Sequence, residues 1–138
     1  MAVRPPSFRY HFTYDAGPVV EIALSGGGST TLRVSVSTGE FISDPVLSSA
    51  ISFDRIDHYE LTRDEFFVEV EAWRASHLKG EGALFDIYRR MRVLAAAADT
   101  QRRAFTEEER LQFSALAMEA RELFTRDHPD PVELSLQD

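Results

Sequence analysis

The sequence predicts an α+β fold, in which an N-terminal antiparallel β-meander of three to five strands has one apolar face covered by three C-terminal amphipathic helices. Two observations predict it. Up to residue 61, apolar and polar residues alternate, as in a half-buried strand, whereas beyond it apolar residues recur every three or four positions, as on one face of a helix. The change coincides with a capping box, Thr62 to Glu65, which marks the start of a helix.

A chain of 138 residues has the usual length of one domain, and no low-complexity linker divides it. We expect a loose N-terminal arm over residues 1–7, a sheet region over 8–61, a helical layer over 62–126 and a tail over 127–138. The apolar faces before and after residue 62 each lack a partner of their own. We therefore expect them to pack on one another as two layers of a single domain, 1–138.

Three segments in the first part of the chain have strand character. Residues 8–14 alternate aromatic with polar side chains, and residues 19–24 and 32–36 repeat the alternation with aliphatic ones. The connections are short, with Asp-Ala-Gly-Pro at 15–18 and a glycine-rich turn at 26–29. Short connections make neighbouring strands antiparallel, so these segments predict a meander.

Residues 38–61 have the least distinct pattern. Residues 40–43 fit a short strand, and residues 56–61 fit a further strand that leads into the capping box. Asp44-Pro45 suits a helix N-cap followed by proline at the first helical position, so residues 46–53 fit a short helix. The same residues also fit a strand alternation, and the pattern leaves both alternatives open.

Three helices follow the capping box. One face of the first carries Phe66, Val70, Trp73 and His77. The second has its apolar stripe over residues 84–98, and the third begins at another capping box, Thr106 to Glu109, whose acids suit the positive end of the helix dipole. It should end before Pro129, because proline disfavours helical geometry in the residue that precedes it. A short strand is predicted for the tail at residues 132–136.

The charge balance narrows the class of partner. The chain carries 23 acidic and 15 basic residues, for a formal net charge of −8. Nucleic-acid binding is disfavoured, because it is driven by lysines and arginines that release counterions from phosphates. The acidic surface either serves solubility alone or complements a basic partner, whose encounter opposite potentials would speed. All basic residues except Lys79 are arginine, a bias typical of GC-rich bacterial genomes.

The N-terminus has no signal-peptide pattern, and no apolar run reaches the roughly 18 residues of a membrane helix. The sequence contains no cysteine, which excludes disulfides and thiolate ligands. These features predict a soluble, cytoplasmic protein that does not enter a membrane.

No residue is predicted to be catalytic, and no cofactor is predicted. The turn around Gly26 to Ser29 lacks the Gly-Lys-Ser/Thr ending of a phosphate-binding loop and leads into a strand, where no helix N-terminus supports an anion. Neither a serine nucleophile motif nor a zinc-binding pair of histidines occurs. His11 lies on the strand face opposite the aromatic residues, where we expect it to be exposed; if a second layer covers that face, it could instead line a pocket. We expect His77 to pack near a helix end with a hydrogen bond.

Acidic residues gather between Asp54 and Glu65, with His58 among them. Converging carboxylates could hold a hard cation and support metal-assisted hydrolysis. Their spacing matches no calcium-binding loop, however, and solvated charge and helix capping explain these acids as well. No metal ligand is therefore assigned.

Two groups of side chains are candidates for binding. Aromatic residues on the strand and the first helix could line a ligand pocket between sheet and helices, although core packing explains them too; they are Phe12, Tyr14 and Trp73. Arginines near the end of the second helix could bind an anion or a partner, or could simply pair with nearby acids; they are Arg89, Arg92, Arg102 and Arg103.

The leading hypothesis is a small acidic protein without catalytic activity that binds another macromolecule, namely a protein with a basic surface or a second copy of itself. Its size and charge resemble those of bacterial immunity and antitoxin proteins, a likeness that no motif supports and that assigns no residue. Edge strands of a short meander could pair across a two-fold axis and form a homodimer. The alternatives are a small-ligand-binding or regulatory domain with a pocket between sheet and helices, and a metal-assisted hydrolase.

Overall fold

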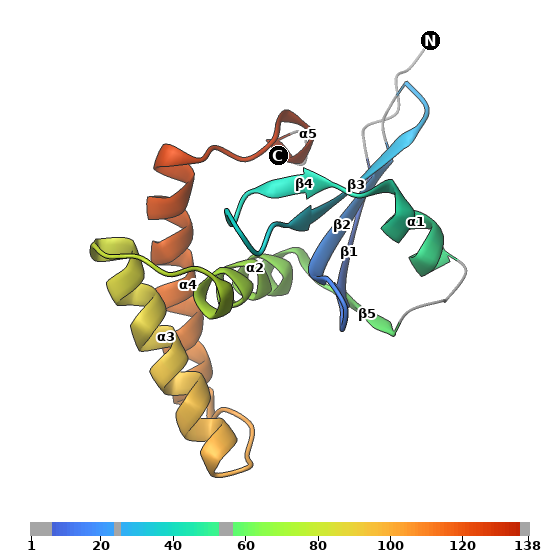
Figure 1. Cartoon of the computed structure of the whole chain (residues 1–138). Helices are drawn as coiled ribbons and strands as arrows, with labels where there is room; N and C mark the ends of the chain where they lie inside the picture. The colour runs from blue at the N-terminus through green and yellow to red at the C-terminus, as the bar shows by residue number, and fades with distance from the viewer. Residues whose placement is uncertain (1–6, 24–25, 53–56, 136–138) are drawn as a thin grey trace.

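A five-stranded antiparallel sheet forms the N-terminal half of the fold (Figure 1). Its strands are β1 (Ser7–Thr13), β2 (Gly17–Ala23), β3 (Ser29–Val34), β4 (Phe41–Ser43) and β5 (His58–Leu61), in the order β4-β3-β2-β1-β5. The structure is a computed structural model that describes residues 7–23, 26–52 and 57–135. The predicted meander is present as β1, β2 and β3, and β5 returns to pair with β1 on its other side.

The helices are α1 (Pro45–Ser52), α2 (Arg63–His77), α3 (Ala83–Thr100), α4 (Glu107–Asp127) and α5 (Val132–Ser135). Both predicted capping boxes form. The Thr62 hydroxyl accepts a hydrogen bond from the backbone N–H of Glu65 at 3.2 Å, and the Thr106 hydroxyl accepts one from Glu109 at 3.1 Å. The α+β fold class that the change of period predicted is thus confirmed.

The stretch with the least distinct pattern contains three short elements. Residues 41–43 form β4, a helix begins at Pro45, and β5 leads into the capping box, so of the two alternatives for residues 46–53 the helix is the one that forms. Asp44 caps it, because its Oδ1 accepts from the N–H of Leu47 at 3.4 Å. Residues 53–56, at the end of the predicted helix and the start of the predicted strand, lie outside the described residues.

The strand predicted for the tail was wrong. Residues 132–135 form the single helical turn α5, whose Leu134 N–H donates to the carbonyl of Pro131 at 3.0 Å. Leu134 is buried in the hydrophobic cluster of the sheet. Alternating Val132 and Leu134 resembled a strand, but one buried leucine in a short turn satisfies the same pattern.

Two hydrophobic clusters hold the described residues together. The first lies between the sheet and α2 and includes Val20, Ile22 and Phe66. The second lies between α2, α3 and α4 and includes Tyr88 and Met91. Of the three long helices, α2 packs directly against the strands. The helices α3 and α4 pack on α2 as a hairpin that extends away from the sheet (Figure 1).

The other face of the sheet is also covered, in part by α1, which lies against β3 and buries Ile51. His11 lies on this face and is only 1% exposed, and Thr13 and Thr31 are buried on it too. The prediction of an exposed His11 was therefore wrong, because this part of the sheet face is covered, although Arg9 nearer the start of β1 stays exposed on it. None of the helices in the described ranges is long and apolar enough to cross a membrane.

Candidate functional site

Three aromatic rings meet at the end of β1 and on the edge strand β5. Phe12 lies in β1 and Tyr14 directly follows the last residue of that strand, and the register places Tyr59 directly opposite Phe12. The ring centroids are 5.5 Å apart for Phe12 and Tyr59, 5.9 Å for Phe12 and Tyr14, and 6.2 Å for Tyr14 and Tyr59. Tyr14 is 68% exposed and Tyr59 is 46% exposed, so the cluster faces solvent.

Two carboxylates of α2 lie beside these rings. Glu65 and Glu69 are one helical turn apart and therefore share a face of α2. Partial burial raises the pKa of Tyr59, and the negative charges of Glu69 and Glu65 raise it further. We call the residues Phe12, Tyr14, Tyr59, Glu65 and Glu69 the aromatic–acidic surface.

Glu69 is the unusual member of this surface. It is half-buried, and burial raises the pKa of its carboxyl, with the charge of Glu65 acting in the same direction. Glu65 closes the capping box through its bond to the N–H of Thr62, but the carboxylate of Glu69 makes no hydrogen bond or ion pair with any other residue that the structure describes. A partly buried carboxylate without a compensating cation is unfavourable, so this position is suited to receive a positive charge.

Trp73, the third residue predicted for a pocket with Phe12 and Tyr14, has different neighbours. Its ring lies against Gly17, at the start of β2, and its centroid is 4.3 Å from that of His77. Its Nε1 is buried and has no hydrogen-bond partner among the described residues. As expected, His77 lies near a helix end and makes a hydrogen bond, with its Nδ1 2.8 Å from the carbonyl oxygen of Trp73, although its side chain is exposed.

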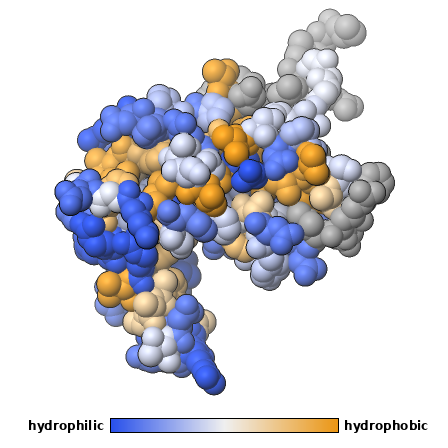
Figure 2. Space-filling view, in the orientation of Figure 1, coloured by the Kyte–Doolittle hydropathy of each residue, from blue (hydrophilic) through white to orange (hydrophobic). Residues whose placement is uncertain are grey.

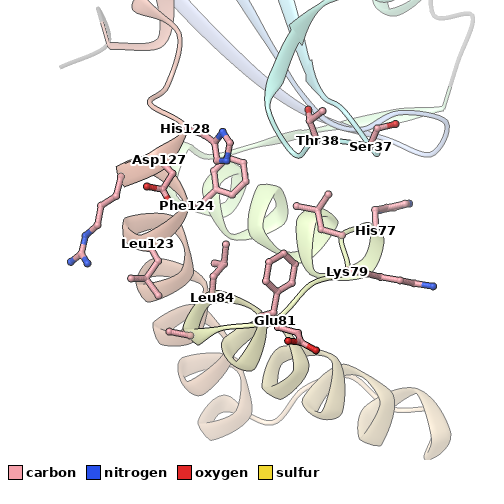
Figure 3. Close-up of a pocket in the computed structure, with 14 residues that line it drawn as sticks. Ser37, Thr38, His77, Lys79, Glu81, Leu84, Leu123, Phe124, Asp127 and His128 are labelled. Carbon is pink, nitrogen blue, oxygen red and sulfur yellow. The ribbon is translucent and has the colours of Figure 1, made fainter.

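A pocket of about 770 Å³ does lie between sheet and helices, but elsewhere (Figure 3). The turn after β3, the end of α2, the start of α3 and the end of α4 enclose it. Leu84 and Phe124 point into it, and Lys79 extends away from it (Figure 3). Hydrophobic residues gather in the middle of this face of the molecule, where sheet and helices meet (Figure 2). None of Phe12, Tyr14 and Trp73 lines this pocket.

The predicted arginine group is largely engaged within the chain. Arg89 pairs with Asp86, and Arg103 binds both carboxylate oxygens of Glu109 at 2.5 and 3.0 Å. Arg92 donates to the carbonyl of Ala75 at 2.6 Å. Arg102 is exposed, with a positive φ of 51°. Two of the four arginines, Arg89 and Arg103, thus pair with nearby acids.

Two of the acids near β5, Glu60 and Glu65, also have local partners. Glu60 accepts a hydrogen bond from Arg9 at 2.7 Å, and Asp64 and Glu65 lie in the first turn of α2. Within residues 7–23, 26–52 and 57–135, no three His, Cys, Asp or Glu side chains gather so that they could hold a metal ion. Asp54, which the sequence grouped with these acids, lies outside the described residues.

The described residues contain two clusters of buried polar side chains whose contacts were not predicted from the sequence. On the covered face of the sheet, His11 Nε2 lies 2.7 Å from Glu21 Oε1, and its ring meets that of His58 edge to face at 5.4 Å. The His11 contact is close but not aligned as a hydrogen bond, and Nδ1 has no partner among the described residues. Both contacts join different strands, so only the strand register could have indicated them.

The second buried group joins α2 to its neighbours. Arg74 Nη1 donates to Glu71 Oε2 at 2.5 Å, Arg74 Nε donates to the carbonyl of Gly39 at 2.7 Å, and the Tyr88 hydroxyl donates to Glu71 Oε1 at 2.9 Å. The three side chains are at most 2% exposed. Burial, with the neighbouring Glu71 carboxylate, raises the pKa of Tyr88, which therefore remains a neutral donor. The spacing of Glu71 and Arg74 on a helix indicates a pair, but not its burial.

No family model matches this chain, and neither a curated protein nor a solved structure shows significant similarity to it. The arguments for a function therefore come from the geometry of the molecule.

Proposed function

We propose that this protein binds another protein through the aromatic–acidic surface, and that the contact surface of the partner is basic. It would act without catalysis, in the manner of an immunity protein, an antitoxin or an adaptor. The observation that carries the proposal is the exposed pair Tyr14 and Tyr59 beside Glu69, a half-buried carboxylate that has no cationic partner in the described part of the chain.

The chemistry of the surface suits a protein interface. Tyrosine rings bury a large area with few rotatable bonds and keep a polar end, which is why they are frequent among the residues that dominate binding energy. The neighbouring carboxylates and the net charge of −8 favour a positively charged partner and would accelerate its approach. An ion pair at a partly buried carboxylate is also screened less by salt than one in open solvent.

The test compares affinity capture from a lysate of the source organism by three forms of the protein. The first is the wild type, and the second carries Tyr14→Ser and Tyr59→Ser. The third, a matched control, carries Val93→Ser and Met118→Ser, which remove two side chains that are also exposed, at 68% and 73%, from α3 and α4. We expect the wild type and the control to capture the same basic protein, and the tyrosine variant to lose it.

Circular dichroism checks that each variant is folded, which we expect because all four substituted side chains are exposed. Capture that depends on Val93 and Met118, with no effect of the tyrosines, would place the interface on the helical hairpin and refute the proposal. A captured partner whose contact surface is acidic would refute it as well.

A second candidate function is the binding of a small molecule in the pocket between the β3–β4 turn and the helices. Its volume of about 770 Å³ is within the range of ligand sites, roughly 300 to 1,000 Å³, and its lining combines apolar side chains such as Leu84 and Phe124 with polar and charged ones. In an NMR screen of small aromatic fragments, we expect saturable shifts at Leu84 that Ala83→Trp abolishes by filling the pocket. Shifts that stay linear with concentration would contradict this candidate.

A further inference from the structure

The chain twice uses one arrangement of arginine, aromatic ring and carboxylate. The Arg74 guanidinium lies 3.7 Å from the ring centroid of Phe124 and donates to Glu71 at 2.5 Å. The Arg121 guanidinium lies 3.6 Å from the ring centroid of Phe67 and donates to Asp130 at 2.8 Å. In each case the flat cation covers a ring face while its N–H groups reach a carboxylate.

The aromatic–acidic surface presents the other two parts of this arrangement. Its rings belong to Tyr14, Tyr59 and Phe12, and its carboxylates belong to Glu65 and Glu69. Among the described residues, the arginines that lie over rings cover Phe41, Phe67 and Phe124, and none covers a ring of this surface. Arg9, on the same strand as Phe12, points to the opposite face of the sheet and pairs with Glu60.

The physical properties of arginine suit this position better than those of lysine. A guanidinium is planar and weakly hydrated, so it can lie on a ring and donate in its own plane to a carboxylate at the same time. An ammonium is compact and strongly hydrated, and it loses more on leaving water. A guanidinium beside Glu69 would also offset the burial that makes its charged form unfavourable.

We propose that the partner contributes an arginine to the aromatic–acidic surface, where its guanidinium lies on the ring of Tyr59 or Tyr14 and donates to Glu69. This inference rests on the proposed function and names the chemical group that the surface recognises. The complex would thus contain, across two chains, the same arrangement of arginine, ring and carboxylate that Arg74 and Arg121 form inside this chain.

The experiment uses three capped heptapeptides that differ only in carrying two arginines, two lysines or two citrullines. Each is titrated into the isotopically labelled full-length protein, and NMR follows the amides of Tyr59 and Glu69. We expect the arginine peptide to bind at least about fivefold more tightly than the lysine peptide, because both stacking and in-plane donation favour it. Citrulline keeps the planar shape without the charge and should give no saturable shift.

Two further variants separate a local effect from one of net charge. Glu69→Gln removes one negative charge with almost no change of shape, and it should weaken the arginine peptide about tenfold. Glu119→Gln removes the same charge from an exposed position on α4 and should change the affinity less than about twofold. The amide spectrum of each variant verifies its fold.

The outcomes distinguish this inference from the proposed function. Equal affinity for the lysine and arginine peptides, with both lost in Tyr14→Ser and Tyr59→Ser, would overturn the inference and leave a basic partner at this surface. Shifts with neither basic peptide would overturn the inference, and the lysate capture then decides the proposed function. Equal weakening by Glu69→Gln and Glu119→Gln would overturn the specific role of Glu69.

Discussion

At the scale of single residues, His11 is a histidine that its surroundings hold in the neutral form. Burial lowers its pKa, and the charges of Arg9 and His58 act in the same direction, whereas the carboxylate of Glu21 opposes them. The net direction is downward because the ring is almost fully enclosed on the covered face of the sheet. The folded protein therefore takes up a proton at His11 less readily than the unfolded chain does.

The pH dependence of stability should show this effect. The pKa of His11 is lower in the folded state than in the unfolded state. Its contribution to the free energy of unfolding is therefore complete above the unfolded pKa of about 6.5, and it is lost as pH falls from there toward the folded pKa. We expect urea unfolding to show a loss of stability over this window that His11→Asn removes. The same slope in wild type and variant would show that His11 does not cause it.

Individual residues also show which parts of the candidate surface a sequence can predict. Alternation in residues 8–14 was enough to group Phe12 with Tyr14, and their ring centroids do lie 5.9 Å apart, although β1 itself ends at Thr13. Tyr59 was missed, because it joins them only through the pairing of β5 with β1, and register between strands distant in the chain leaves no local signal. Glu65 was noted for its capping role, and Glu69 had no distinguishing pattern at all.

At the scale of elements, one glycine allows the turn between β1 and β2 to lie close against α2. Gly17 has a φ of +72°, a left-handed conformation that glycine adopts readily. A Cβ at this position would lie 2.6 Å from the indole ring of Trp73, so the turn can approach α2 closely only without a side chain. This glycine thus sets the distance between the hairpin and the helix.

Gly17→Ala should destabilise the protein in two ways: alanine disfavours the left-handed backbone conformation at this position, and its Cβ would clash with the ring of Trp73. Gly28→Ala is the matched control, because its φ of +80° is similar but no atom lies within 4 Å of the added Cβ. Overpacking typically costs about 1 to 3 kcal/mol, so we expect the Gly17 variant to be less stable than the Gly28 variant by roughly that amount in urea unfolding. Equal effects would mean that Trp73 moves aside without cost.

The helices were predictable because their signals are local. Both capping boxes and the stripes between them lie within a few residues, and they form as the sequence indicated. The tail was not, since the choice between a strand and a single turn at residues 132–135 depends on how Leu134 reaches the core. The sequence also could not predict that α2 packs on the sheet whereas α3 and α4 pack on α2. An apolar stripe shows that one face of a helix is buried, but it does not show which element covers that face.

At the scale of the whole molecule, α2 connects two hydrophobic clusters, and its buried polar network secures the junction. Arg74 reaches the carbonyl of Gly39 in the turn before β4, stacks on Phe124 of α4 and pairs with Glu71, which in turn binds Tyr88 of α3. A buried pair of this kind fixes geometry more than it adds stability, because desolvation offsets much of the attraction.

Removing both partners of this network should therefore cost less than the sum of the losses from removing each one alone. Arg74→Met leaves Glu71 buried without its cation, and we expect a loss of about 3 to 5 kcal/mol in the free energy of unfolding. The double variant Arg74→Met and Glu71→Leu should lose less than the sum of the two single variants, as a double-mutant cycle by urea unfolding would measure. Additive losses would show that the two side chains do not act as a pair.

The return of β5 to β1 also has a consequence for the order of folding. The rings of Phe12 and Tyr14 and the ring of Tyr59 come from opposite ends of the sheet segment, so they become neighbours only when the last strand docks. Closing so long a stretch of chain is slow, whereas hairpins and helices form from local contacts. A nascent or partly folded chain therefore lacks the surface altogether, and the partner that we propose would bind finished molecules and not unfinished ones.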